Sequence, residues 1–211
     1  MSGGASREGT LAAIRANRPK GDFPLPPLPA FAPLVEGDLV TAFGERLERM
    51  GGRMVRAGDG PDALAPVREK LSAAEVVASA VPEVAGNRDL ASVEKPGDLE
   101  DVDVAVVRAA FGISETGSVL FTERELVVNS VAYLAQHLIV LLDPVDILDT
   151  VQTAYRRPEF ADSAYAVLHT GPSATADIEG VLIHGAQGVR SLTVVLVPHR
   201  GEAACAGAAG T

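Results

Sequence analysis

Residues 101–122 read DVDVAVVRAAFGISETGSVLFT, and this stretch does most to limit the folds open to the chain. Segment 101–113 is rich in valine and predicts a β-strand, and the apolar segment 117–122 predicts another. The four residues SETG between them end in the glycine that a tight turn favours. The sequence therefore predicts two strands joined as a hairpin, with Gly117 in the turn.

Strand-like and helix-like segments alternate on both sides of this hairpin. Further strands are expected at 53–57, 75–80, 137–142, 165–170 and 191–197. Helices are expected at 37–50, 61–72, 143–155 and 174–185. This alternation predicts an α/β fold, with a largely parallel layered sheet, helices on both of its faces and one hairpin.

The chain is expected to have three regions. Residues 1–34 combine a short helix over 6–17 with an extended arm that contains six prolines, residues 35–200 form the α/β domain, and residues 201–211 are a flexible tail. The arm either packs on its own body or on a neighbouring subunit, or serves as a peptide for a domain with an aromatic groove. The last possibility arises because the arm matches the pattern PxxP.

Composition limits the classes of partner. The formal net charge of −10 argues against binding to nucleic acid or to anionic lipid. The single cysteine, Cys205, provides no basis for an iron–sulfur or zinc site, which needs several ligands. The chain shows no secretory signal and no apolar run long enough to span a membrane, so we expect a cytoplasmic location.

Common catalytic and cofactor motifs are missing from the sequence. It contains no GxGxxG after a strand, no GxxxxGK[ST], and no HExxH, CxxC or GxSxG. The histidines at 137, 169, 184 and 199 do not have metal-ligand spacing. We therefore expect this chain to bind no metal and no cofactor.

The stretch HTGPSATADIEG, residues 169–180, has two interpretations. In the first it starts a helix: Gly171 and Pro172 make a turn, Ser173 or Thr175 caps the helix, and Asp177 complements the helix dipole. In the second it lines a site, because ligands of open α/β sheets bind at the carboxyl ends of strands. Asp177 would repel a bare phosphate and favour a ligand that carries a hydroxyl or an amine. We expect the loop to be both helix cap and pocket wall.

Three other residues raise a similar choice. Glu115 and Thr116 are either exposed turn residues or converge on the same pocket as the 171–177 loop. His137 opens an apolar strand and is either a residue at the edge of the core or a ligand-binding group.

Ser173 has no base placed beside it by the sequence, so nucleophilic catalysis is not expected and the catalytic residues stay unknown.

The assembled motifs resemble the LUD-domain family, over about residues 35–198. FGISETGSVLF resembles the family's GIAETGT segment, and QHLIVLL resembles its P-x-x-H-I-x-V strand, with His137 in the histidine place and Ala135 where proline is common. The segment from His169 to Val197 resembles GPS-x-TADIE followed by GVHGP and L-x-V. The chain departs from the family pattern at Ala174, Gln187 and Val189.

The resemblance implies which residues form the site. The carried-over ligand-binding candidates are Glu115, Thr116, Gly117, His137, Gly171, Pro172, Ser173, Thr175 and Asp177, with Gln187 carried over less firmly because it replaces a histidine.

The resemblance also implies a fold similar to sugar-phosphate isomerases and coenzyme A transferases. It further implies a role in oxidising L-lactate to pyruvate, as a non-redox subunit or accessory partner of proteins that carry iron–sulfur clusters, with a small organic acid or related ligand. The alternative is an independent enzyme on the same fold that acts on a small acid, a sugar phosphate or a thioester.

Overall fold

The computed structural model describes residues 6–24, 26, 29, 37–57, 64–177 and 179–198. Most of the PxxP pattern, the first residues of the helix expected at 61–72, and the expected tail with Cys205 lie outside these residues. The chain divides into two compact units, residues 1–31 and 32–211. The first unit contains helix α1 (Arg7–Asn17), which confirms the helix expected there, with the Ser6 hydroxyl accepting a hydrogen bond from the Gly9 amide at 3.1 Å.

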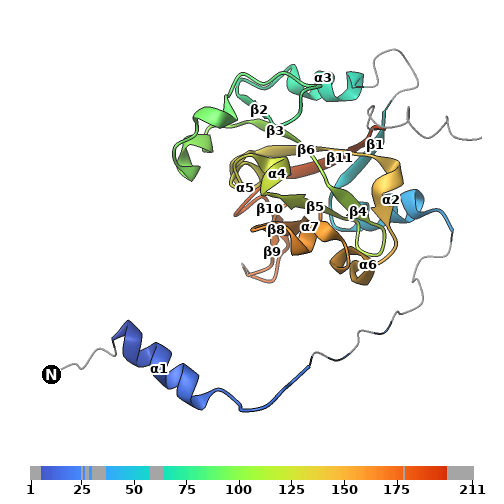
Figure 1. Cartoon of the computed structure of the whole chain (residues 1–211). Coiled ribbons are helices and arrows are strands. Elements are labelled where there is room, and N and C mark those ends of the chain that lie inside the picture. Colours follow the sequence, from blue (N-terminus) through green and yellow to red (C-terminus); the bar gives the residue numbers. More distant parts are fainter. Residues whose placement is uncertain are drawn as a thin grey trace, which may run out of the picture. The chain divides into compact units, whose positions relative to one another are not determined.

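The second unit is built on a five-stranded sheet in which every pairing is parallel (Figure 1). Its spatial order is β1-β11-β6-β3-β2. The strands are β1 (Arg53–Arg56), β2 (Val77–Ser79), β3 (Val104–Arg108), β6 (His137–Leu142) and β11 (Ser191–Leu196). This sheet confirms the α/β class and the mainly parallel arrangement that the sequence predicts.

The predicted hairpin belongs to a second sheet. Strands β4 (Phe111–Ile113) and β5 (Ser118–Thr122) pair antiparallel, which confirms the hairpin. The sheet has the order β7-β4-β5-β8, and its outer strands are β7 (Ile147–Leu148) and β8 (Ala166–His169). The single strand expected over 101–113 is wrong, because the chain leaves the parallel sheet after Arg108 and enters the second sheet at Phe111.

The helices cover the sheets in layers. They are α2 (Leu39–Arg49), α3 (Ala65–Leu71), α4 (Glu123–Leu126), α5 (Val131–Leu134), α6 (Val151–Tyr155) and α7 (Pro158–Ala161), with short 3-10 helices at Leu90–Ser92, Pro96–Leu99 and Pro144–Asp146. Helix α3 packs on one face of the parallel sheet through Val67. The second sheet packs on the opposite face, and α6 and α7 lie on its far side (Figure 1).

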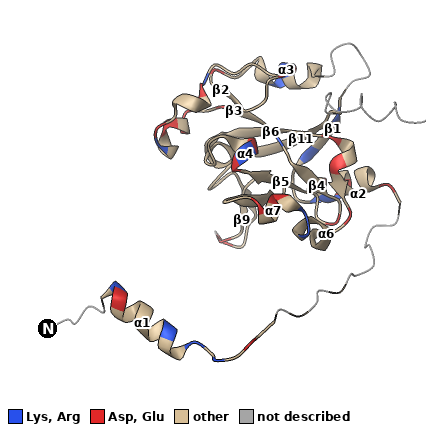
Figure 2. Cartoon of the chain, viewed as in Figure 1, with Lys and Arg blue, Asp and Glu red and all other residues tan. Residues whose placement is uncertain are grey.

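Alternation along the strands accounts for these layers. On β6, Leu138, Val140 and Leu142 contribute to the core between the two sheets, whereas Ile139 and Leu141 contribute to the core under α3. Successive side chains of a strand point to opposite faces, so one apolar run supplies both cores. The buried polar side chains among the described residues are all hydroxyls. Figure 2 shows the charged residues mainly on the helices and connecting segments.

Two helix predictions were wrong. Segment 143–155 forms a 3-10 turn, strand β7 and then α6, rather than one helix. Segment 174–185 forms a two-stranded ribbon, β9 (Ala174–Thr175) paired antiparallel with β10 (Ile183–His184). Glu179 and Gly180 have φ of 56° and 70°, in the left-handed region where a right-handed helix cannot continue. The expected dipole role of Asp177 therefore has no helix to act on.

The described part of the chain also bears on two classes of site. None of its helices has the length and apolarity that crossing a membrane requires. Within the same residues, no three histidine, cysteine, aspartate or glutamate side chains are grouped so that they could hold a metal ion.

Candidate functional site

Four residues singled out from the sequence line one pocket of about 340 Å³. They are Gly171, Pro172, Ser173 and Gln187. We call this cavity the loop pocket; its lining residues are Ala132, Tyr133, 167–173 and 187–189. The 171–173 loop directly follows the carboxyl end of β8, so the sequence placed the loop correctly at the end of a strand.

The loop itself is fixed from two sides. Gly171 has φ of 70°, and a Cβ atom there would lie 2.3 Å from the Met50 carbonyl oxygen, so only glycine allows this approach to the end of α2. The Ser173 amide donates to the Val189 carbonyl at 3.0 Å, and the Ser173 carbonyl accepts from the Gly185 amide at 2.7 Å. The backbone of the loop is therefore held in place without use of the Ser173 hydroxyl.

A short series of hydroxyls connects the hairpin turn to the loop pocket. The Thr116 and Ser118 hydroxyl oxygens lie 2.7 Å apart, and Ser118 in turn hydrogen-bonds the Thr170 hydroxyl at 2.5 Å. Gly117 has φ of 68° and packs against the backbone of Leu47 in α2. Thr116 therefore reaches the pocket wall through Ser118, and Gly117 lets the turn approach the helix.

Three of the other site candidates lie outside the loop pocket. Glu115 Oε2 accepts a hydrogen bond from the Val151 amide at 2.8 Å, at the first residue of α6. Thr175 is in β9 and its hydroxyl accepts from the Asp177 amide at 3.3 Å. Asp177 is exposed, and neither it nor Thr175 lines the loop pocket. The structure therefore does not bring Glu115, Thr175 and Asp177 together with the loop.

Tyr133 and His169 line the loop pocket and were missed as candidates. The His169 ring lies 5.3 Å from the Phe121 ring and 5.0 Å from the Tyr133 ring, measured between centroids. Burial lowers the pKa of His169 to about 4, so its imidazole is neutral at neutral pH. Its Nε2 atom is buried without a hydrogen-bond partner among the described residues.

The Tyr133 hydroxyl is kept protonated. Burial raises the pKa of Tyr133 well above its ordinary value, and the hydrogen bond between the Tyr133 and Tyr165 hydroxyls raises it further. The signal for His169 was its place at the end of a predicted strand, just before the loop. Tyr133 gave no such signal, because the segment around it mixes helical and strand periods.

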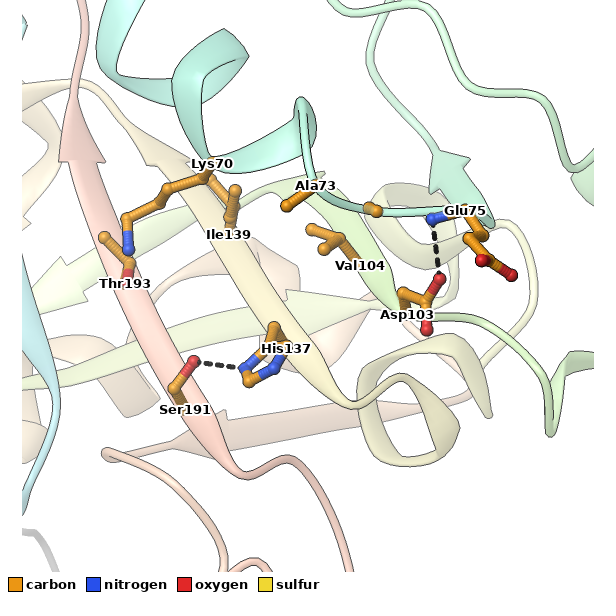
Figure 3. Close-up of a pocket in the computed structure, with 10 residues that line it drawn as sticks. Lys70, Ala73, Glu75, Asp103, Val104, His137, Ile139, Ser191 and Thr193 are labelled. Atoms are coloured by element: carbon orange, nitrogen blue, oxygen red, sulfur yellow. Dashed lines mark hydrogen bonds between the residues drawn. The ribbon is translucent and has the colours of Figure 1, made fainter.

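His137 lies in a different pocket, of about 560 Å³, on the α3 side of the parallel sheet (Figure 3). We call it the sheet pocket; its lining residues are Lys70, 73–75, Asp103, Val104, His137, Ile139, Ser191 and Thr193. His137 and Ser191 are the first residues of β6 and β11, and their side chains hydrogen-bond at 2.8 Å between Nδ1 and Oγ. His137 therefore does not converge with the 171–173 loop.

The two pockets differ in their chemistry. The lining of the loop pocket includes no Asp, Glu, Lys or Arg among the described residues, and offers hydroxyls, an amide and a neutral imidazole. Such a pocket holds a small polar ligand through hydrogen bonds rather than ion pairs. The sheet pocket instead contains Lys70, Glu75 and Asp103.

Comparisons with known proteins show which family this chain is similar to. The LUD domain profile matches residues 88–197. Lactate utilization protein C of Deinococcus radiodurans is 27% identical over 194 residues, which cover 88% of this chain and 90% of that protein. The crystal structure of a DUF162 family protein from Deinococcus radiodurans matches with a TM-score of 0.58 at 17% identity, and covers 78% of this chain and 99% of that one. The last comparison shows a shared fold.

Proposed function

This chain belongs to the LUD domain family, and we propose that it takes part in the utilisation of L-lactate as a non-redox protein that binds a small organic acid in the loop pocket. The observation that carries the proposal is the likeness, along nearly the whole of both chains, to a protein named for lactate utilisation. The loop pocket supports it because its size and neutral polar lining suit a small hydroxy acid.

The groups of the loop pocket complement such an acid. The neutral ring of His169 can accept a hydrogen bond from a ligand hydroxyl, and the hydroxyl of Ser173 can donate to a carboxylate. A pKa of about 4 makes His169 a weak general base near neutral pH, where catalysis favours a pKa close to the working pH. This property favours a binding role over independent catalysis by the isolated chain.

Oxidation of lactate to pyruvate releases two electrons and two protons, so an electron acceptor must take part. Iron–sulfur clusters are held by several cysteine thiolates, and this chain has one cysteine. We therefore assign the redox step to partner proteins that carry the clusters. Purifying the tagged chain anaerobically from lactate-grown cells tests this: co-purifying iron and acid-labile sulfide are expected, and their absence would leave the chain without such partners.

The central experiment measures L-lactate-dependent reduction of an electron acceptor in lysates of a strain that lacks this chain. The strain is re-supplied with wild type, Ser173→Ala or Asp177→Ala. We expect wild type and Asp177→Ala to restore the rate, and Ser173→Ala to restore about a tenth of it, because a hydrogen bond to a charged group contributes about 1.5–3 kcal/mol. Asp177 is the matched control, since it lies on the same segment but outside the pocket.

The possible outcomes separate the parts of the proposal. Full activity in the deletion strain would remove the role in lactate utilisation and favour an independent enzyme. Equal rescue by all three proteins would keep that role but take the loop pocket out of it. Expression and thermal melting of each variant are measured alongside, because the backbone contacts of Ser173 do not involve its hydroxyl and both substitutions should leave the fold intact.

A further inference from the structure

The sheet pocket exists because α3 covers only part of its face of the parallel sheet. The helix ends at Leu71, and the pocket opens over the amino ends of β3, β6 and β11 (Figure 3). Along this face β11 changes from Ser191 and Thr193 to the apolar Val195, which packs in the core under α3. A parallel sheet is normally covered on both faces. Here the open part of the face carries polar groups.

One end of the sheet pocket carries hydrogen-bond donors without partners. Thr193 is only 3% exposed and its hydroxyl makes no hydrogen bond with the described residues, but this oxygen is not among the fully buried atoms without a partner, so it is accessible from the pocket. Lys70 also lines the pocket, and Figure 3 shows its side chain extending from α3 toward β11, the strand of Thr193; within the described part of the chain the Lys70 ammonium makes no ion pair. A ligand acceptor at this end would satisfy both groups.

The other end of the sheet pocket is negative. Asp103 Oδ2 accepts hydrogen bonds from the Val76 amide at 2.9 Å and the Glu75 amide at 2.8 Å. These two hydrogen bonds hold the pKa of the Asp103 carboxyl below its usual value and keep it ionised, and the bond from Val76 has the larger effect. The Glu75 carboxylate lies beside it in Figure 3 and has no ion-pair partner among the described residues.

From this arrangement we infer that the sheet pocket binds a zwitterion whose carboxylate lies against Lys70 and Thr193 and whose ammonium lies against Asp103 and Glu75. A simple carboxylate would meet two negative groups at the far end, and a simple amine would leave the Lys70 end unsatisfied. The pocket is a different site from the loop pocket, and the inference does not depend on a role in lactate utilisation.

Strand spacing sets the length of this ligand. Thr193 lies on β11 and Asp103 precedes β3, with β6 between the two strands. Neighbouring strands are about 4.8 Å apart, and the register places Thr193 three residues further along its strand than Asp103, at about 3.3 Å per residue. The two ends of the pocket are therefore separated by about 14 Å. Allowing about 2.8 Å for a charge-assisted hydrogen bond at each end leaves roughly 8 Å between the ligand's charges. An α-amino acid is too short, and a zwitterion with several carbons between its charges fits.

The test titrates the full chain with 6-aminohexanoate, hexanoate, hexylamine and alanine, and follows binding by calorimetry and by the NMR shifts of the His137 ring. We expect 6-aminohexanoate to bind at least about tenfold more tightly than each of the other three, equivalent to about 1.4 kcal/mol. Equal binding of hexanoate would make the pocket a plain carboxylate site, and equal binding of hexylamine a plain cation site. Either result, or no binding of 6-aminohexanoate, overturns the inference.

Two variants assign the binding to the donor end. Lys70→Met and Thr193→Val are each expected to weaken 6-aminohexanoate binding at least about fivefold, as for the loss of one ordinary hydrogen bond. Lys95→Met is the control, because Lys95 is exposed and lies outside the pocket. Thr193→Val removes a hydroxyl that makes no hydrogen bond with the described residues and replaces it with a methyl group, so the melting temperature should not fall. Unchanged affinity in both pocket variants would contradict the inference.

Discussion

His169 is a single residue whose burial makes the stability of the fold depend on pH. Its pKa is about 4 in the folded chain, against about 6.5 when unfolded, so protons favour the unfolded state. The stability associated with neutral His169 is fully present above about pH 6.5 and is lost as the pH falls toward 4. Between about pH 7.5 and pH 5 this single group should lower the free energy of unfolding by about 2 kcal/mol.

Urea denaturation of wild type and His169→Leu at these two pH values measures the effect. Carboxylates whose pKa values are lowered, such as Asp103 and Asp149, add their own acid sensitivity to both proteins. The quantity of interest is therefore the difference between the two pH dependences. The pH dependence of His169→Leu should be smaller by about 2 kcal/mol. Equal pH dependences would mean that His169 is not held neutral by burial.

Glu115 illustrates a residue that the sequence singled out for a site and that the structure places at a helix start. Its carboxylate accepts from the Val151 amide, which α6 leaves without a partner within the helix. Glu115→Ala should therefore lower the free energy of unfolding by about 1 kcal/mol, and Glu115→Gln by less, because the amide oxygen still accepts. Lactate-dependent rescue should be unaffected by either. A lost rescue at wild-type stability would instead return Glu115 to the site.

At the scale of elements, the hairpin turn and α2 depend on each other. A Cβ atom at position 117 would lie 2.3 Å from the Leu47 amide nitrogen, in backbone that cannot move easily, and the left-handed φ adds about 1–2 kcal/mol for any other residue. Gly117→Ala should lower the free energy of unfolding by about 3 kcal/mol or more. Chemical denaturation of the purified variant measures this loss.

Gly97 supplies the matched control for that substitution. A Cβ atom added there would meet nothing within 4 Å, and its φ is ordinary. Gly97→Ala should leave stability unchanged or raise it by up to about 1 kcal/mol, because alanine restricts the unfolded chain. Similar losses in both variants would show that the contact between the turn and α2 is not what Gly117 preserves.

Elements with one dominant local signal were predictable from the sequence. The strand at 137–142, the hairpin with its turn glycine and the helix at 37–50 were all predicted, because each has one clear local signal. Segment 174–185 was misassigned as a helix because its caps look correct locally. In the structure the Thr175 hydroxyl accepts a hydrogen bond from the Asp177 amide in a local turn. The Ser173 backbone forms hydrogen bonds with the backbone of Val189 and Gly185. These distant backbone bonds are not visible in local sequence.

Only part of the candidate site could be predicted from the sequence. The 171–173 loop was found from its glycine, proline and serine, and it does line a pocket. After Arg108 the chain passes from the parallel sheet into the second sheet, where the hairpin lies. A continuous apolar run gives no sign of this change of sheet. Tyr133 reaches the loop pocket from α5, and His137 lines a different pocket. Such convergence depends on tertiary packing, which spacing along the chain does not encode.

At the scale of the whole domain, two packed sheets predict an uneven distribution of local stability. The β6 strand lies between β3 and β11, and Leu138–Leu142 are buried against cores on both faces. Opening this strand requires both cores to separate, so its amides should exchange with solvent only through global unfolding. The β9–β10 ribbon has two paired positions and is mostly exposed, so it can open alone.

Hydrogen exchange followed by mass spectrometry tests this distribution on the intact chain. Peptides covering 138–142 should exchange at least about a hundredfold more slowly than peptides covering 174–184, because the opening energies differ by several kcal/mol. The ratio should shrink in Gly117→Ala, since global unfolding becomes easier while opening of the ribbon does not change. Equal protection of the two segments would mean that the ribbon is tied into the core by contacts stronger than its two strand pairs. The loop pocket, whose wall includes Gly171–Ser173 just before the ribbon, would then belong to the rigid part of the domain.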